Sequence, residues 1–103
     1  HIKNDLFLNQ IFVFTPKGDV IELPENATPL DFAYNIHSDV GTQCIGAKVN
    51  DNMASLDTIL KSGDVIEIMR DKNRKLPNAD WLNIVVTQGA RAKIRAKLKN
   101  SPE

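Results

Sequence analysis

Hydrophobic positions in residues 1–70 come in short runs separated by turn residues, a pattern typical of strands. Residues 11–14 (IFVF) and 20–23 (VIEL) are rich in β-branched and aromatic side chains, which favour strands. A Pro-Lys-Gly sequence lies between them at residues 16–18. It suits a tight turn, because proline presets φ and glycine accepts a positive φ. Residues 11–23 are therefore predicted to form a β-hairpin.

Further short runs occur later in the chain. We predict three more strands, at residues 43–49, 53–55 and 65–69. Gly46 lies inside the first of these, which indicates a β-bulge or a close approach of another backbone. Residues 56–60 (LDTIL) are predicted to make one short helical turn that stops at Ser-Gly-Asp.

One segment, residues 28–41, carries the signals of a helix start and a helix stop. Thr28 can cap the start, and Pro29 suits the first helical position because it has no N–H to leave unpaired. Asp31 places a negative charge in the first turn, where the helix dipole favours it. Gly41 ends the run, as glycine commonly does. The segment is predicted to be one short helix.

The faces of this helix differ in polarity. At about 100° per residue its apolar residues fall on one stripe, formed by Pro29, Ala33 and Ile36. Asp31 and Asn35 point away from the stripe, and His37 lies at its edge, near the C-terminal end. We therefore expect a mostly buried helix with one ionisable residue at its rim.

The predicted order of elements is β-β-α-β-β-β. A helix laid across one face of a mixed sheet buries the apolar faces of both. Together with the Leu-x-x-Gly-Asp turn at residues 60–64, this order predicts an α+β fold of the ubiquitin-like β-grasp type. Its mixed sheet would hold one central helix and would span residues 10–70.

The C-terminal part alternates small or apolar residues with basic ones over residues 90–99 (ARAKIRAKLK). Alternation suggests a strand, but Ala, Arg, Lys and Leu are strong helix formers and Thr87 can cap a helix. We therefore predict a basic helix, in which Ala90, Ile94 and Leu98 share one face. Before it, residues 78–83 (NADWLN) offer a second helix start with Trp81 as an anchor.

The net charge of zero hides a split along the chain. Residues 1–69 carry four basic and ten acidic residues, a charge of −6, whereas residues 70–103 carry nine basic and three acidic residues, a charge of +6. Such asymmetry suggests two parts with different surroundings. We predict an upstream tail at 1–9, one domain at 10–70, a linker at 71–79 and the start of a following helical region at 80–103. The chain is thereby expected to be a fragment of a longer protein.

The sequence shows no catalytic constellation. Its two histidines lie far apart, and no His, Cys, Asp or Glu group has the spacing of metal ligands. The single cysteine, Cys44, lies in an apolar run and is predicted to be a core residue. No Gly-Gly occurs, which argues against a sulfur carrier or protein tag. We expect a non-enzymatic, cytoplasmic module with no cofactor, no metal and no membrane segment.

His37 has two possible roles. It is either a rim histidine that satisfies one nitrogen on the backbone, or a binding residue, since imidazole can stack on a base and also hydrogen-bond. For Tyr34 a core or rim position is favoured over a stacking platform.

The basic residues of the last helix, Arg91 and Arg95 among them, either face phosphates or form a solvated helix face. Lys17 and Lys48 are isolated along the sequence, and solvation is their favoured interpretation.

Several of these segments closely resemble the TGS domain, which threonyl-tRNA synthetases, some GTPases and SpoT-type enzymes share. They are VFTPKGD at 13–19, TPLDFAYNIHSDVG at 28–41, GAKVN at 46–50 and GDVIEI at 63–68. The later DWLN and ARAKIR pieces resemble the segment on the C-terminal side of TGS in the long RelA/SpoT-type (p)ppGpp synthetase/hydrolases. The resemblance covers residues 6–99 and favours a RelA/SpoT parent.

The resemblance implies a regulatory module that biases hydrolase and synthetase domains of the same chain. It implies that the module senses the 3′-CCA end of an uncharged tRNA on the ribosome, with His37 as a contact residue. Gln43 stands where members that hold tRNA tightly carry a basic residue. In other members the same domain binds acyl carrier protein. The candidate binding residues are thus His37, Tyr34, Gln43, Lys48, Lys17, Arg91 and Arg95.

Two alternatives remain open from the sequence. The module could belong to a GTPase or a threonyl-tRNA synthetase and bind RNA there. It could also be a β-grasp that interacts only with proteins.

Overall fold

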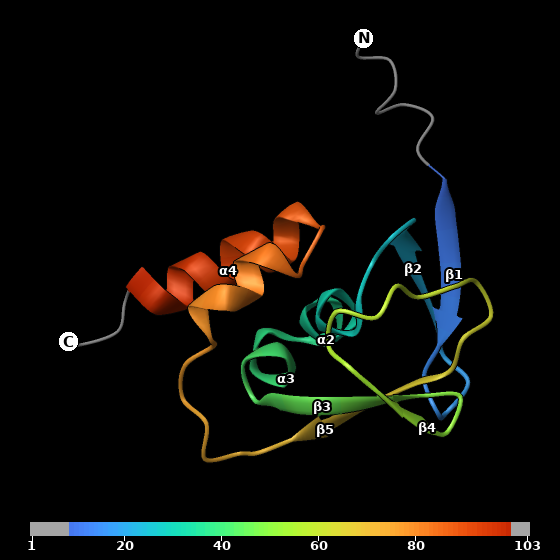
Figure 1. The fold of residues 1–103 in the computed structure, drawn as a ribbon, viewed down its shortest axis with the longest axis horizontal. Coiled ribbons are helices and arrows are strands. Elements are labelled where there is room, and N and C mark those ends of the chain that lie inside the picture. The colour runs from blue at the N-terminus through green and yellow to red at the C-terminus, as the bar shows by residue number, and fades with distance from the viewer. Residues whose placement is uncertain (1–8, 100–103) are drawn as a thin grey trace, which may run out of the picture.

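The computed structural model describes residues 9–99 (Figure 1). The predicted tail and C-terminal end lie partly outside this range, at residues 1–8 and 100–103. In chain order the elements are β1 (Gln10–Phe14), β2 (Val20–Pro24), α2 (Pro29–Ile36), α3 (Ser38–Thr42), β3 (Cys44–Val49), β4 (Asn52–Ala54), β5 (Ile66–Arg70), the 3₁₀ helix η1 (Ala79–Asn83) and α4 (Gln88–Lys99).

The strands pair in two antiparallel groups. β1 and β2 form the predicted hairpin, from Gln10 opposite Pro24 to Phe14 opposite Val20, and β4, β3 and β5 form a three-stranded sheet in that order. A parallel bridge between Phe14 and Val65 joins the two groups. The Phe14 N–H also donates to the Asp64 carbonyl at 2.8 Å. The fold is therefore a mixed α+β fold of antiparallel sheets and helices, consistent with a β-grasp.

Strand β3 contains the irregularity that Gly46 predicted. Cys44 pairs with Arg70 and Gly46 with Met69, so Ile45 is an extra residue and the register shifts there. This β-bulge turns Ile45 outward, where more than half of its surface is exposed. The bulge prediction is confirmed.

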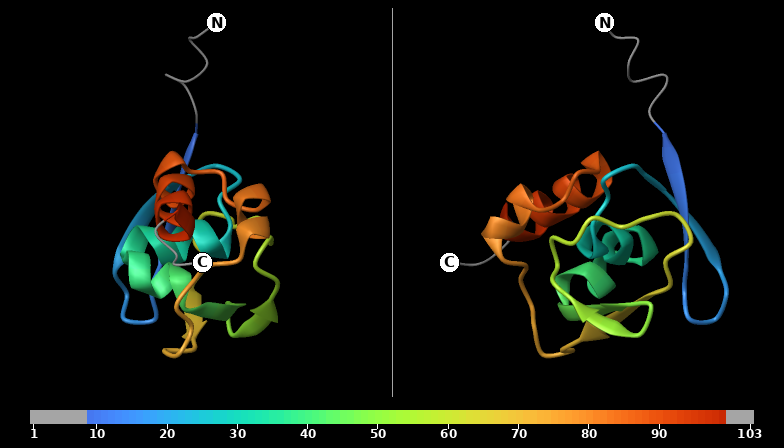
Figure 2. Two further views of the ribbon diagram at one scale, coloured as in Figure 1. Left: turned by 90° about the vertical axis from the view of Figure 1, so that its left-hand side faces the viewer. Right: turned by 45° about the vertical axis from the view of Figure 1, so that its right-hand side comes forward.

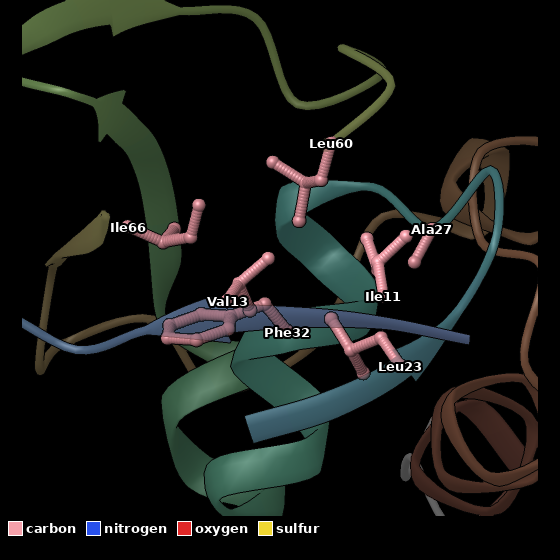
Figure 3. Packing of buried hydrophobic residues seen from close by; sticks show 7 residues of the cluster. All are labelled: Ile11, Val13, Leu23, Ala27, Phe32, Leu60 and Ile66. Atoms are coloured by element: carbon pink, nitrogen blue, oxygen red, sulfur yellow. The ribbon is translucent and has the colours of Figure 1, made fainter. Parts of the chain in front are cut away.

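The elements lie in layers (Figure 2). Helix α2 lies between the sheet of β3 and β5 on one side and α4 on the other. Phe32 of α2 joins the first buried cluster, on the side of the β1–β2 hairpin (Figure 3). That cluster consists of Ile11, Val13, Leu23, Ala27, Phe32, Leu60 and Ile66. Burial of these side chains from the hairpin, α2, β5 and two connecting loops holds the N-terminal elements together.

A second buried cluster joins residues 79–99 to α2. Leu30 and Tyr34 of α2 and Cys44 of β3 meet the C-terminal residues Trp81, Val85, Ala90 and Ile94. Helix α4 thus buries the predicted face, with Ala90 and Ile94 inside and Leu98 partly buried. In the segment between β5 and η1, the Arg74 guanidinium lies over the Trp81 ring, 5.2 Å from the ring centre. The division of the chain at residues 71–79 stays a prediction, while the segments on its two sides share this core.

The structure corrects the predicted helix at residues 28–41. The segment forms two helices instead of one. The backbone of His37 is extended (φ −172°, ψ 149°), so α2 ends before this residue and α3 begins after it. Ile36, expected on the buried stripe, is 43% exposed, and Asp31, expected to face away, is 1% exposed. Residues 56–60 form only a turn without a helix, in which the Thr58 N–H donates to the Ser55 carbonyl.

Candidate functional site

His37 occupies the junction between α2 and α3. Its backbone N–H donates to the Ala33 carbonyl at 3.2 Å and so caps the end of α2. Its Nδ1 accepts from the Asp39 N–H at 3.0 Å and caps the start of α3. Since Nδ1 is the acceptor, the neutral ring carries its proton on Nε2. The side chain is 64% exposed, so the ring face and Nε2–H remain available to a partner.

The junction rests on a close contact between Tyr34 and Gly41. A Cβ placed on Gly41 would lie 2.4 Å from Tyr34 Cγ and 2.5 Å from both Cδ atoms. Glycine is therefore required here because the tyrosine ring lies directly against the α3 backbone. The Tyr34 hydroxyl hydrogen-bonds the Thr42 hydroxyl at 3.4 Å, and the ring is buried. Tyr34 is thus positioned to hold α3, and with it His37, in place.

At the other end of α3, Gln43 is bonded to Arg70 of β5. Gln43 Oε1 accepts from Arg70 Nε at 3.1 Å and from Nη2 at 2.7 Å. The Gln43 carbonyl also accepts from the Asp71 N–H at 2.8 Å. Arg70 was not among the residues predicted for the site. Arg70 lies next to Gln43 because β3 pairs with β5, and in that pairing Arg70 lies opposite Cys44.

The two predicted lysines lie elsewhere. Lys48 of β3 lies opposite Met53 of β4 and Glu67 of β5. Lys17 lies in the exposed turn between β1 and β2, and Figure 1 shows this turn on the other side of the molecule from α4. The structure therefore brings His37 and Gln43 to one short helix and leaves the lysines outside that group.

The cations of α4 divide into two groups. Arg91 is partly buried and donates from Nη2 to the Val85 carbonyl at 3.1 Å. Lys93 Nζ donates to the Tyr34 carbonyl of α2 at 2.9 Å. Arg95, Lys97 and Lys99 are exposed. Arg91 and Lys93 thus help to hold α4 in its place, while Arg95 lies on the solvated face.

Asp31 connects α2 with the start of α4, although the helical pattern predicted that its side chain would point away from the buried face. Its Oδ2 accepts from the N–H and hydroxyl of Thr28, at 3.0 and 3.1 Å. Its Oδ1 accepts from the N–H groups of Val86 and Thr87 at 3.0 Å and from the Thr87 hydroxyl at 2.9 Å. The predicted cap of α4 is present as well, since Thr87 Oγ1 accepts from the Ala90 N–H. One buried carboxylate therefore caps α2 and fixes the start of α4. A groove of about 240 Å³ lies beside it, between β2, α2 and α4.

Two buried acids make the stability of the fold sensitive to alkali. Burial raises the pKa of the Tyr34 phenol above 10.0 and that of the Cys44 thiol above 9.0. The native state therefore holds these protons more tightly than the unfolded chain does. The contribution of these two protonated groups to the free energy of unfolding is fully present below their ordinary pKa values. It is lost as pH rises through the raised pKa values of the folded state.

We accordingly expect the free energy of unfolding to fall as the pH rises above 9, the ordinary value of a cysteine thiol. Urea titrations from neutral to strongly alkaline buffer measure it. The variant Tyr34→Phe removes the phenol and should show a shallower decline. A free energy of unfolding that stays constant over this range would contradict the assignment.

Within residues 9–99 no group of three or more His, Cys, Asp or Glu side chains could hold a metal ion. None of the helices described is long and apolar enough to cross a membrane.

Comparison with known proteins identifies this arrangement. A model of the TGS domain matches residues 11–70. The chain belongs to the TGS domain family. In the solved structures, a GTP-binding protein from Pyrococcus horikoshii OT3 superimposes with a TM-score of 0.59 at 22% identity, over 62% of this chain and 22% of that one. At that identity the likeness concerns the fold alone.

Curated relatives confirm the resemblance to RelA/SpoT proteins. The chain is 50% identical to a GTP pyrophosphokinase of Myxococcus xanthus over 95% of its length and 13% of the relative's. It is also 50% identical to the bifunctional (p)ppGpp synthase/hydrolase SpoT of Escherichia coli strain K12, over 96% of this chain and 14% of that one. A probable guanosine-3′,5′-bis(diphosphate) 3′-pyrophosphohydrolase of Synechocystis is 50% identical over 98% of this chain and 13% of its own length. The chain thus spans about an eighth of the length of these relatives.

Proposed function

We propose that this chain is the regulatory TGS module of a cytoplasmic, bifunctional (p)ppGpp synthetase/hydrolase of the stringent response. In this proposal it has a ubiquitin-like β-grasp with α2 as the central helix and α4 as a basic segment beside it. It senses the 3′-CCA end of an uncharged tRNA on the ribosome and biases distant catalytic domains of the same protein. The proposal rests mainly on His37, whose ring is 64% exposed and held at Nδ1 by the Asp39 N–H.

The geometry of His37 suits a single-stranded RNA end. Unpaired bases are recognised by stacking on aromatic rings and by hydrogen bonds to base edges. The exposed ring of His37 offers a stacking face, and its Nε2–H offers a donor. Because the cap to Asp39 fixes the ring, little conformational entropy is lost when a base stacks on it.

The remaining candidates take supporting parts in this proposal. Tyr34 is buried and positions α3, and Arg91 positions α4, so neither contacts RNA directly. Lys48, Lys17 and Arg95 are charges at other places on the surface and add long-range attraction only. Gln43 acts at the site through its hydrogen bonds.

The charge distribution limits the affinity of the isolated chain. Residues 1–69 carry a net charge of −6, whereas phosphate attraction usually supplies much of the affinity for nucleic acids. We therefore expect the isolated chain to bind RNA weakly, with other parts of the parent and the ribosome supplying most of the binding energy. Submicromolar binding at physiological salt would contradict this expectation.

Two substitutions of His37 separate its capping role from its binding role. His37→Asn keeps a side-chain acceptor that suits a helix cap but removes the aromatic ring. It should fold as the original chain does and yet abolish tRNA-dependent activation of synthesis in the full-length parent. His37→Ala should also lose activation, with an additional loss of about 1 kcal/mol in the free energy of unfolding.

Circular dichroism melts check folding, and (p)ppGpp synthesis with and without uncharged tRNA on ribosomes checks signalling. Unchanged activation of the His37→Asn parent would remove His37 from the site.

A protein partner is the second candidate function. Ile45 and Met53 are more than half exposed, and the ends of Met53 and Met69 both lie near Gly46. Methionine-rich surfaces adapt well to protein partners. Acyl carrier protein is the partner that the resemblance suggests. Loss of its binding on Met53→Ser, with tRNA activation intact, would support this second function.

A further inference from the structure

We propose that Arg70 supplies the phosphate contact of the His37 surface and that Gln43 positions its guanidinium. This inference rests on the proposed function and extends it to a residue at the end of β5. It concerns a phosphate of the same RNA strand whose terminal bases reach His37.

The hydrogen bonds of Arg70 leave part of its guanidinium available. Nε and Nη2 both donate to the single oxygen of the Gln43 amide, at 3.1 and 2.7 Å. A guanidinium has five N–H donors in a planar fork, so Nη1 and the second proton of Nη2 are left. Charge-assisted bonds to phosphate from such a fork are strong and directional.

No carboxylate within residues 9–99 forms an ion pair with Arg70. Its neighbour Asp71 accepts from the Asn73 N–H, and Asp39 lies 3.8 Å from His37 Nδ1. A neutral amide thus holds the guanidinium without neutralising it. Two long side chains ordered in this way lose less entropy when a phosphate binds.

Helix α3 connects the two parts of the proposed site. His37 and Gln43 flank α3 as its N-cap and C-cap, and six residues of helix rise about 9 Å. The Arg70 guanidinium, bonded to Gln43, and the His37 ring therefore lie at the two ends of one short helix, α3. Lys17 and Lys48 lie outside this group, which leaves Arg70 as the cation that β5 brings to it.

Salt dependence separates a phosphate contact from a stacking contact. The probe is a fluorescent single-stranded RNA ending in CCA, titrated with the 103-residue chain by fluorescence anisotropy at several salt concentrations. Each phosphate contact to a single strand contributes about 0.7 to the slope of log K against log salt. Arg70→Gln should reduce that slope by about 0.7 and weaken binding about tenfold at low salt.

Matched variants give the controls. Lys61→Gln removes the same charge from an exposed loop and should leave slope and affinity nearly unchanged. Arg70→Lys should restore the slope but only part of the affinity, because lysine lacks the fork that Gln43 holds. Gln43→Leu should keep the slope and weaken binding several-fold. His37→Asn should weaken binding without changing the slope.

The outcomes distinguish this inference from the proposed function. RNA binding that depends on His37 with a slope unaffected by Arg70→Gln overturns the inference and leaves the proposed function standing. An absence of binding at low salt overturns the inference, whereas the proposed function is overturned only by unchanged activation of the His37→Asn parent on ribosomes. Equal losses of slope in Arg70→Gln and Lys61→Gln indicate general charge attraction and also overturn the inference.

Discussion

The substitution Asp31→Asn is expected to lower the free energy of unfolding by about 3 kcal/mol. The carboxylate accepts hydrogen bonds from Thr28 on one oxygen and from Val86 and Thr87 on the other. Asparagine has almost the same shape, but its amide NH₂ would face N–H or O–H donors on one side. Buried donors left without an acceptor cost more than the lost bonds alone. A domain of this size is stabilised by roughly 5–15 kcal/mol, so the expected loss is a large share.

Two probes reveal where the damage lies. Trp81 is buried in the cluster shared with α2, so its fluorescence reports the docking of residues 79–99. Circular dichroism reports the whole fold. In Asp31→Asn we expect the fluorescence transition in urea to move to lower concentrations than the circular dichroism transition, because the bonds to residues 86–87 are lost first.

The control is Asp19→Asn, which makes the same chemical change at an exposed turn. It should alter the free energy of unfolding by no more than about 0.5 kcal/mol. Equal stability of the Asp31→Asn and Asp19→Asn variants would contradict the structural role of Asp31.

The substitution Gly41→Ala is expected to cost about 3 kcal/mol, at the upper end for overpacking. The added methyl would lie 2.4 Å from a ring carbon of Tyr34, and that ring is buried in the second cluster, where close packing resists displacement. Alanine is otherwise the better helix former, so helix propensity at this position in α3 would favour the variant. A loss of stability therefore isolates the steric contact, and urea denaturation measures it.

A matched glycine and a double variant complete this test. Gly89 in α4 has no atom within 4 Å of an added Cβ, and Gly89→Ala should stabilise the chain by up to about 1 kcal/mol. In the double variant Gly41→Ala with Tyr34→Leu, the smaller side chain relieves the clash. The combined loss should be smaller than the sum of the two single losses. Additive losses would show that the clash with the ring is not the cause.

Asp31 and Gly41 also explain the position of His37 at the surface. Asp31 fixes the start of α2, and the contact of Tyr34 with Gly41 fixes α3 against its end. His37 lies between these two points and belongs to neither buried cluster. Substitutions at Asp31 or Gly41 should therefore damage folding, whereas His37→Asn should damage recognition alone.

Local sequence patterns determined most of the secondary structure. The hairpin turn, the start of α2 at Thr28, the bulge at Gly46 and the buried face of α4 all depend on residues near each other in the chain. Such features follow from backbone preference and periodicity. The motifs at residues 13–19 and 28–41 also carry the resemblance to the TGS family, which the relatives confirm.

The tertiary structure decided what depends on residues that meet from far apart. Periodicity placed Asp31 on the polar side of its helix, but residues 86–87, more than fifty positions later, bring their N–H groups to it and bury it. The pairing of β3 with β5 likewise brings Arg70 to Gln43. A polar side chain is stable inside a protein when donors or acceptors from other segments satisfy it, and a sequence read segment by segment does not contain that information.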